Sequence, residues 1–156
     1  MDSEVKLYLE RAENKIIIAK ASFEISLDNN KKEQLGIPIN QTFFNDVISH
    51  AYYAIFYSAK AYLISKEIKT KAPEEHKKTF DEFSKLVDLG IIDLELLKIY
   101  QKMLIKTDAL LHLFKLEKSK RGNFTYKTIP QANQEPAQES IKNAKVFFNN
   151  IFRLCK

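Results

Sequence analysis

Residues 43–68, FFNDVISHAYYAIFYSAKAYLISKEI, decide the fold of this chain. Apolar side chains recur here every three or four residues, which is the spacing of one face of an α-helix. They cover two faces, which comprise Phe44, Ile48, Ala51, Ile55 and Tyr62 on one and Tyr52, Tyr53, Phe56 and Leu63 on the other. A helix that is apolar nearly all round lies at the centre of a core or between a core and a second subunit. We therefore interpret its aromatic residues as core packing rather than as a ligand site.

A seam of small side chains runs along the same predicted helix. Its members are Ala51, Ala54, Ser58 and Ala61, spaced by three, four and three residues. Such a seam lets a second helix approach closely. The seam could serve the core of this chain or an interface with another protein.

Turn signals separate this helix from one predicted helix before it and one after it in the chain. A first helix is predicted from about Ser3 to Leu27, followed by a loop over DNNKKEQLGIPINQ, residues 28–41. The helix after residue 68 is expected to hold Pro73 in its first turn and to end at Gly90.

Two further helices complete the predicted fold. One covers residues 94–118 and is capped by Asp93, and the last holds Pro136 in its first turn and ends at Phe152 or Leu154. No long run alternates with period two, and three glycines offer little turn chemistry for a sheet. We predict one all-α domain over residues 1–156, an up-and-down bundle of four to five helices.

Composition limits the possible partners and the compartment. The net charge of +5 and the pI near 9.1 permit a polyanionic partner, although lysine-rich solvated faces have the same composition. Cys155 is the only cysteine, which excludes an intrachain disulfide and suits a reducing cytoplasm. The charged N-terminus does not resemble a signal peptide, and the uncharged run at 47–59 is too short to span a bilayer. We expect a cytoplasmic protein without membrane contact.

Several kinds of catalytic site are not supported by the sequence. It contains no glycine-rich phosphate loop, no HExxH pair and no GxSxG turn, and its three histidines fall on three predicted helices. Two of them, His50 and His112, follow Asp46 and Asp108 by four residues, where an ordinary side-chain pair is the expected interpretation. We expect no metal and no cofactor.

The stretch EKSKRGNFTYKTIPQAN, residues 117–133, combines cations with aromatic rings around a glycine. Its candidate binding residues are Lys118, Lys120, Arg121, Phe124, Tyr126 and Lys127. Arginine and lysine pair with phosphate, and phenylalanine or tyrosine offers a plane on which a base can stack. The stretch therefore predicts contact with single-stranded RNA or a nucleotide, unless it is a solvated connection whose aromatics fold back onto the bundle.

The segment HAYYAIFYSAKAYLISKEI, residues 50–68, resembles the second helix of the HEPN domains. The segments LERAENKIIIAKASF, HKKTFDEFSKLVDLGIID and ESIKNAKVFFNNI agree with that family in type and order. The resemblance implies a helical bundle that is usually a homodimer. It also implies a toxin–antitoxin, defence or RNA-processing setting, often beside a minimal nucleotidyltransferase.

The resemblance also implies an activity for one branch of the family, which cleaves RNA without metal. That branch uses an arginine followed, after four to six residues, by a histidine. None of the three arginines here has such a histidine: Arg121 has Tyr126 at that offset, and the other near match pairs Lys106 with His112. Tyrosine, with an ordinary pKa of about 10, is a poor proton shuttle, and lysine lacks the planar fork of arginine.

We therefore expect a dimeric HEPN-like protein that binds RNA or a nucleotide, or that partners a nucleotidyltransferase, without ribonuclease activity. The alternative is a metal-independent endoribonuclease toxin that uses Arg121 with Tyr126 or Lys106 with His112.

Overall fold

The computed structural model describes the backbone of residues 1–119 and 133–156, and the side chains of residues 1–110 and 133–156. Every regular element in these ranges is a helix. They are α1 (Ser3–Leu27), α2 (Asn29–Gln34), α3 (Phe44–Ser65), α4 (Glu75–Asp88), α5 (Leu94–Ser119) and α7 (Gln134–Leu154). The prediction of an all-α bundle is confirmed.

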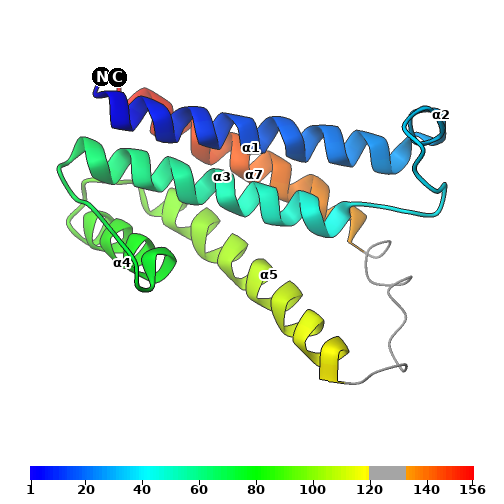
Figure 1. Ribbon diagram of the computed structural model, residues 1–156. Coiled ribbons are helices and arrows are strands. Elements are labelled where there is room, and N and C mark those ends of the chain that lie inside the picture. The colour runs from blue at the N-terminus through cyan, green and yellow to red at the C-terminus, as the bar shows by residue number, and fades with distance from the viewer. Residues whose placement is uncertain (120–132) are drawn as a thin grey trace.

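The long helices α1, α3, α5 and α7 alternate in direction, as in an up-and-down bundle (Figure 1). Helices α1, α3 and α7 pack together, α5 lies at an angle to them, and the shorter α4 packs against α3 and α5. The N- and C-termini lie beside each other. No helix in the described part of the chain is both long and apolar enough to cross a bilayer.

Helix ends follow local chemistry at Asp93 and Gly90, as predicted, and also at Asp2. Asp2 accepts a hydrogen bond from the amide of Glu4 at 3.0 Å, and Asp93 accepts one from the amide of Glu95 at 3.0 Å. These side chains satisfy free amides at the start of α1 and α5. Gly90 has φ +73° just beyond α4, a conformation that residues with a Cβ rarely adopt.

Two local predictions were wrong. The predicted loop at 28–41 contains α2, because the Asp28 carboxylate accepts a hydrogen bond from the amide of Lys31 and caps a short helix there. Helix α4 begins at Glu75, so Pro73 lies before its first turn rather than within it. Pro136 does lie in the first turn of α7, as predicted.

Helix α3 forms the centre of the core. Both of its predicted apolar faces are buried except at Tyr53, which is 37% exposed. The small-residue seam is wholly buried inside the bundle. The seam therefore serves core packing in this chain and is not available as an interface.

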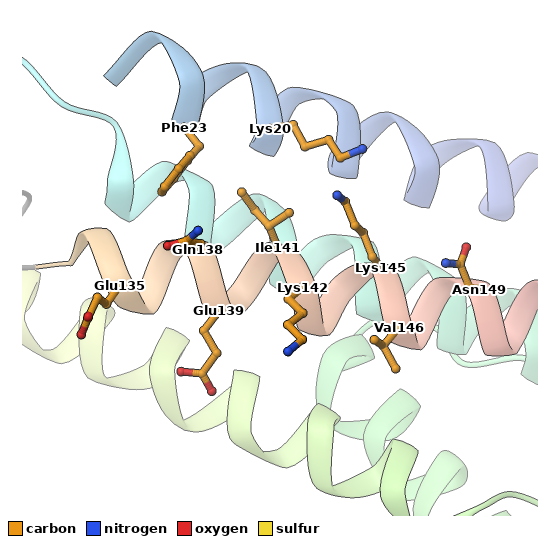
Figure 2. A pocket seen from close by; sticks show the side chains of 10 residues that line it. All are labelled: Lys20, Phe23, Glu135, Gln138, Glu139, Ile141, Lys142, Lys145, Val146 and Asn149. Carbon is orange, nitrogen blue, oxygen red and sulfur yellow. The ribbon is translucent and has the colours of Figure 1, made fainter. Parts of the chain in front are cut away.

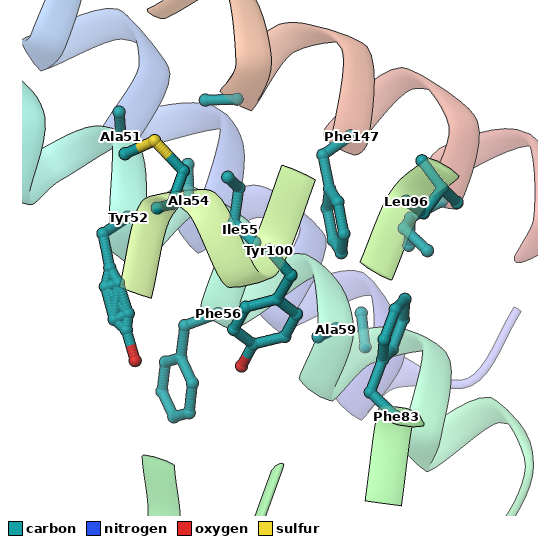
Figure 3. Close-up of a cluster of buried hydrophobic side chains, with 14 of the residues drawn as sticks. Ala51, Tyr52, Ala54, Ile55, Phe56, Ala59, Phe83, Leu96, Tyr100 and Phe147 are labelled. Carbon is teal, nitrogen blue, oxygen red and sulfur yellow. The ribbon is translucent and has the colours of Figure 1, made fainter. Parts of the chain in front are cut away.

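A second part of the core joins α4, α5 and α7 through aromatic rings. Phe83, Tyr100 and Phe147 have ring centroids 5.5–5.8 Å apart and are wholly buried (Figure 3). The Tyr100–Phe147 pair meets edge to face at 86°, which adds a favourable term to the burial of apolar area.

A buried ion pair fixes the start of α4 against α3. Lys60 is 5% exposed, and its Nζ contacts the carboxylate of Glu75 and donates to the carbonyl of Thr70 at 3.1 Å. The Thr79 hydroxyl adds a hydrogen bond of 2.6 Å with the hydroxyl of Thr70. The first turn of α4 is thus held in one position on α3.

Removal of one ring tests the aromatic part of the core. We expect Phe147→Ala to lower the free energy of unfolding by about 3–5 kcal/mol, because it leaves a cavity where three helices meet. Ile105→Ala, at a side chain that is 70% exposed, should change it by less than about 0.5 kcal/mol. Urea denaturation followed by circular dichroism measures both values, and equal losses would contradict this description of the core.

The two partners of the buried ion pair should respond differently to removal. Glu75→Gln leaves the buried Lys60 ammonium without its countercharge and should cost about 1–3 kcal/mol of unfolding free energy. Lys60→Met should cost less, because the Glu75 side chain is 36% exposed and can be solvated. The same denaturation assay tests this order, and a larger loss in Lys60→Met would contradict it.

Candidate functional site

Most of the candidate residues predicted from the sequence lie outside the part of the chain that the structure describes. Lys120, Arg121, Phe124, Tyr126 and Lys127 fall within residues 120–132. Lys118 and His112 belong to α5, but their side chains are likewise outside the described residues. The binding and catalytic predictions for them therefore stay predictions.

Lys106 is described, and it is engaged with α7. Its Nζ lies 3.5 Å from a carboxylate oxygen of Glu139, and the side chain is 19% exposed. Lys102 pairs with the same carboxylate. Both cations lower the pKa of Glu139, and Lys102 has the larger effect. A phosphate that recruited Lys106 would have to compete with Glu139.

The described residues bring together a different pair, Tyr52 of α3 and His76 of α4. The Tyr52 hydroxyl and His76 Nδ1 lie 2.8 Å apart. Burial raises the pKa of Tyr52 and lowers the pKa of His76. The Glu75 carboxylate opposes the shift of His76 and the Lys60 ammonium adds to it. At neutral pH both groups are therefore uncharged, and the hydroxyl can donate to Nδ1 when the imidazole carries its proton on Nε2.

Aromatic rings hold the His76 imidazole in place. Phe56 stacks on it with centroids 3.9 Å apart and an interplanar angle of 7°. Tyr53 meets its edge at 5.5 Å and 89°. Because Phe56 lies on α3 one turn after Tyr52, a single helix supplies both the stacking ring and the hydrogen bond. His76 thus has a defined orientation while remaining half-buried.

Cations from α1 extend this cluster across the surface. The Arg11 guanidinium lies 5.1 Å from the ring centroid of Tyr8 and 6.0 Å from that of Tyr57. Lys15 Nζ lies 5.5 Å from the ring centroid of Tyr53. Within the described residues, neither Arg11 nor Lys15 forms an ion pair. We call Tyr8, Arg11, Lys15, Tyr53, Tyr57 and His76 the cationic aromatic surface.

This surface has the components that bind nucleic acid. Arginine and lysine attract phosphate, and partly exposed tyrosine rings offer planes for bases. This surface was not predicted from the sequence, because the tyrosines of α3 were assigned to the core. One signal was present: Tyr8, Arg11 and Lys15 are spaced by three and four residues, which places them on one face of α1.

One of the two aspartate–histidine pairs predicted from the sequence is Asp46 with His50, both on α3. Burial lowers the pKa of His50, and Lys15 adds to this effect and outweighs Asp46. Lys15 is thus close enough to both His50 and Tyr53 to influence them. The positive charge on α1 therefore disfavours protonation of His50.

Comparison with known proteins identifies the family of this chain. The model of the HEPN domain matches residues 37–153, from before α3 to the end of α7. A protein of Methanocaldococcus jannaschii named "Putative toxin MJ0605" is 28% identical over 153 residues, which cover 98% of this chain and 90% of the relative. The family match extends over most of the chain and agrees with the helical bundle described above. The chain belongs to the HEPN domain family.

Proposed function

We propose that this HEPN protein binds single-stranded RNA or a nucleotide through the cationic aromatic surface, in a toxin–antitoxin or defence setting. The toxin name of the archaeal relative supports the setting. The whole chain would act as one cytoplasmic domain that forms a homodimer, with a minimal nucleotidyltransferase as partner. The observation that carries the proposal is the placement of Arg11 and Lys15 over tyrosine rings at the surface.

The chemistry of this surface favours a single strand over a duplex. The rings of Tyr8, Tyr53 and Tyr57 can receive only bases that are not already stacked in a helix. The two cations lie beside the rings, so a backbone phosphate and its base could be bound together. Residues 117–133, with Arg121 and Tyr126, are proposed as a further contact with the same strand.

A second candidate function is metal-independent cleavage of the bound RNA, and the Tyr52–His76 hydrogen bond favours it. When the neutral imidazole carries its proton on Nδ1 and donates it to the Tyr52 hydroxyl, its Nε2 is free to accept the proton of a ribose 2′-hydroxyl. Arg11 and Lys15 lie on the neighbouring face and could stabilise charge on the scissile phosphate. This composite site would replace the family's arginine–histidine motif, which the chain lacks.

RNA affinity tests the first proposal. We expect Arg11→Gln combined with Lys15→Gln to weaken binding of a fluorescein-labelled single-stranded RNA in an anisotropy titration. The loss of two phosphate contacts should reduce the slope of log K against log salt by about 1.4. The matched control is Lys85→Gln with Lys98→Gln, which removes the same charge from exposed positions on α4 and α5.

The same titration separates the two proposed contacts. Lys120→Glu with Arg121→Glu should also weaken binding if residues 117–133 touch the strand. The role of the cationic aromatic surface would be contradicted if the salt slope were the same in the parent, in Arg11→Gln with Lys15→Gln, and in the control Lys85→Gln with Lys98→Gln. It would also be contradicted if the parent protein bound no RNA.

Cleavage tests the second candidate. Purified protein with chelator should cut single-stranded RNA, and His76→Ala should abolish the cutting. Because the pKa of His76 is lowered, its neutral form persists to lower pH, and kcat/KM should begin to fall only below about pH 6.5. Activity that survives His76→Ala but disappears in His112→Ala or Tyr126→Phe would move the chemistry to α5 or to residues 120–132.

A further inference from the structure

A groove of about 850 Å³ lies between α1 and α7, away from the cationic aromatic surface. Lys20 follows Arg11 by nine residues, roughly two and a half turns at 3.6 residues per turn, so the two side chains leave opposite sides of α1. The groove is therefore a separate feature, and it needs its own explanation.

Two ammonium groups meet in this groove. Figure 2 shows Lys20 of α1 and Lys145 of α7 with their amino groups directed toward each other. Within the described residues neither lysine forms an ion pair. The proximity of Lys20 lowers the pKa of Lys145, as expected for two like charges without an anion between them.

The carboxylates that line the groove do not neutralise this pair. Glu139 is directed toward α5, where it pairs with Lys102 and Lys106. Glu135 lies at the far end of the groove, more than two turns of α7 from Lys145. The amide of Asn149 lies one turn of α7 beyond Lys145 and can add a hydrogen-bond donor.

Between the lysine pair and Glu135, the groove has an apolar part. Phe23 lies one turn after Lys20 on α1, and Ile141 lies one turn before Lys145 on α7. Because the two helices run in opposite directions, both apolar side chains fall on the same side of the lysine pair (Figure 2). The amide of Gln138 lines this end as well. The groove thus presents a cationic part beside an apolar part, within reach of one small molecule.

We propose that the groove binds a phosphate monoester with a flat apolar group, its phosphate between Lys20 and Lys145 and its ring against Phe23 and Ile141. The phosphate oxygens accept hydrogen bonds from both ammonium groups and remove their mutual repulsion. The ring covers apolar surface that the groove otherwise leaves to water. This site is independent of the RNA proposal, so either can fail without the other.

Phenyl phosphate is the probe that tests the proposal, with binding followed by chemical-shift changes in NMR spectra of the full chain. Lys20→Gln and Lys145→Gln should each weaken binding about tenfold, as expected for the loss of one charge-assisted hydrogen bond. Lys98→Gln is the matched control, because Lys98 is an exposed lysine of α5 that does not line the groove. It should leave the affinity within about twofold of the parent.

Two further probes define the ligand class. Inorganic phosphate should bind more weakly than phenyl phosphate because it lacks the ring, and isophthalate should bind more weakly because its carboxylates do not present a tetrahedral phosphate. The proposal is overturned if isophthalate or inorganic phosphate binds as tightly as phenyl phosphate. It is also overturned if the Lys98 control loses as much affinity as the Lys20 and Lys145 variants, or if no probe shifts the groove residues.

Discussion

The burial of α3 is the constraint on which the other helices depend. Its side chains are apolar on nearly every face, and each large one contributes about 1.5–3 kcal/mol when removed from water. One partner helix cannot cover such a surface, so α1, α4, α5 and α7 all pack against it. The small seam at Ala51, Ala54, Ser58 and Ala61 is part of this arrangement, because its residues are wholly buried and allow close packing. The bundle is in this sense built around one helix.

The cationic aromatic surface forms where the cover of α3 is incomplete. Tyr53 and Tyr57 reach the edge of the core, and α1 meets them with Arg11 and Lys15 rather than with apolar side chains. The buried contact of Lys60 with Glu75 sets the first turn of α4, and that turn carries His76 to Tyr52 and Phe56. Core packing and the candidate site therefore share residues, and α3 supplies the centre of both.

Periodicity and capping were enough to predict the helices but not the site. The bounds of α1 and the start of α5 agree with the prediction, because Asp2 and Asp93 cap them locally. Helix α2 was missed, since a six-residue helix leaves no periodic pattern. The Tyr52–His76 contact joins residues 24 positions apart on two helices, and no local pattern encodes it. The Lys20–Lys145 pair depends on the pairing of α1 with α7 and was equally out of reach. The sequence-based site candidates fall largely outside the described residues, so their roles stay predictions.

We propose above that RNA lies on the face formed by α1 and α3. Photocrosslinking of a single-stranded RNA to the protein, with the linked residues identified by mass spectrometry, measures this contact directly. We expect crosslinks at Tyr53 and Tyr57, with Tyr8 as the next site. Crosslinks that avoid all three tyrosines and fall only elsewhere on the chain would contradict it.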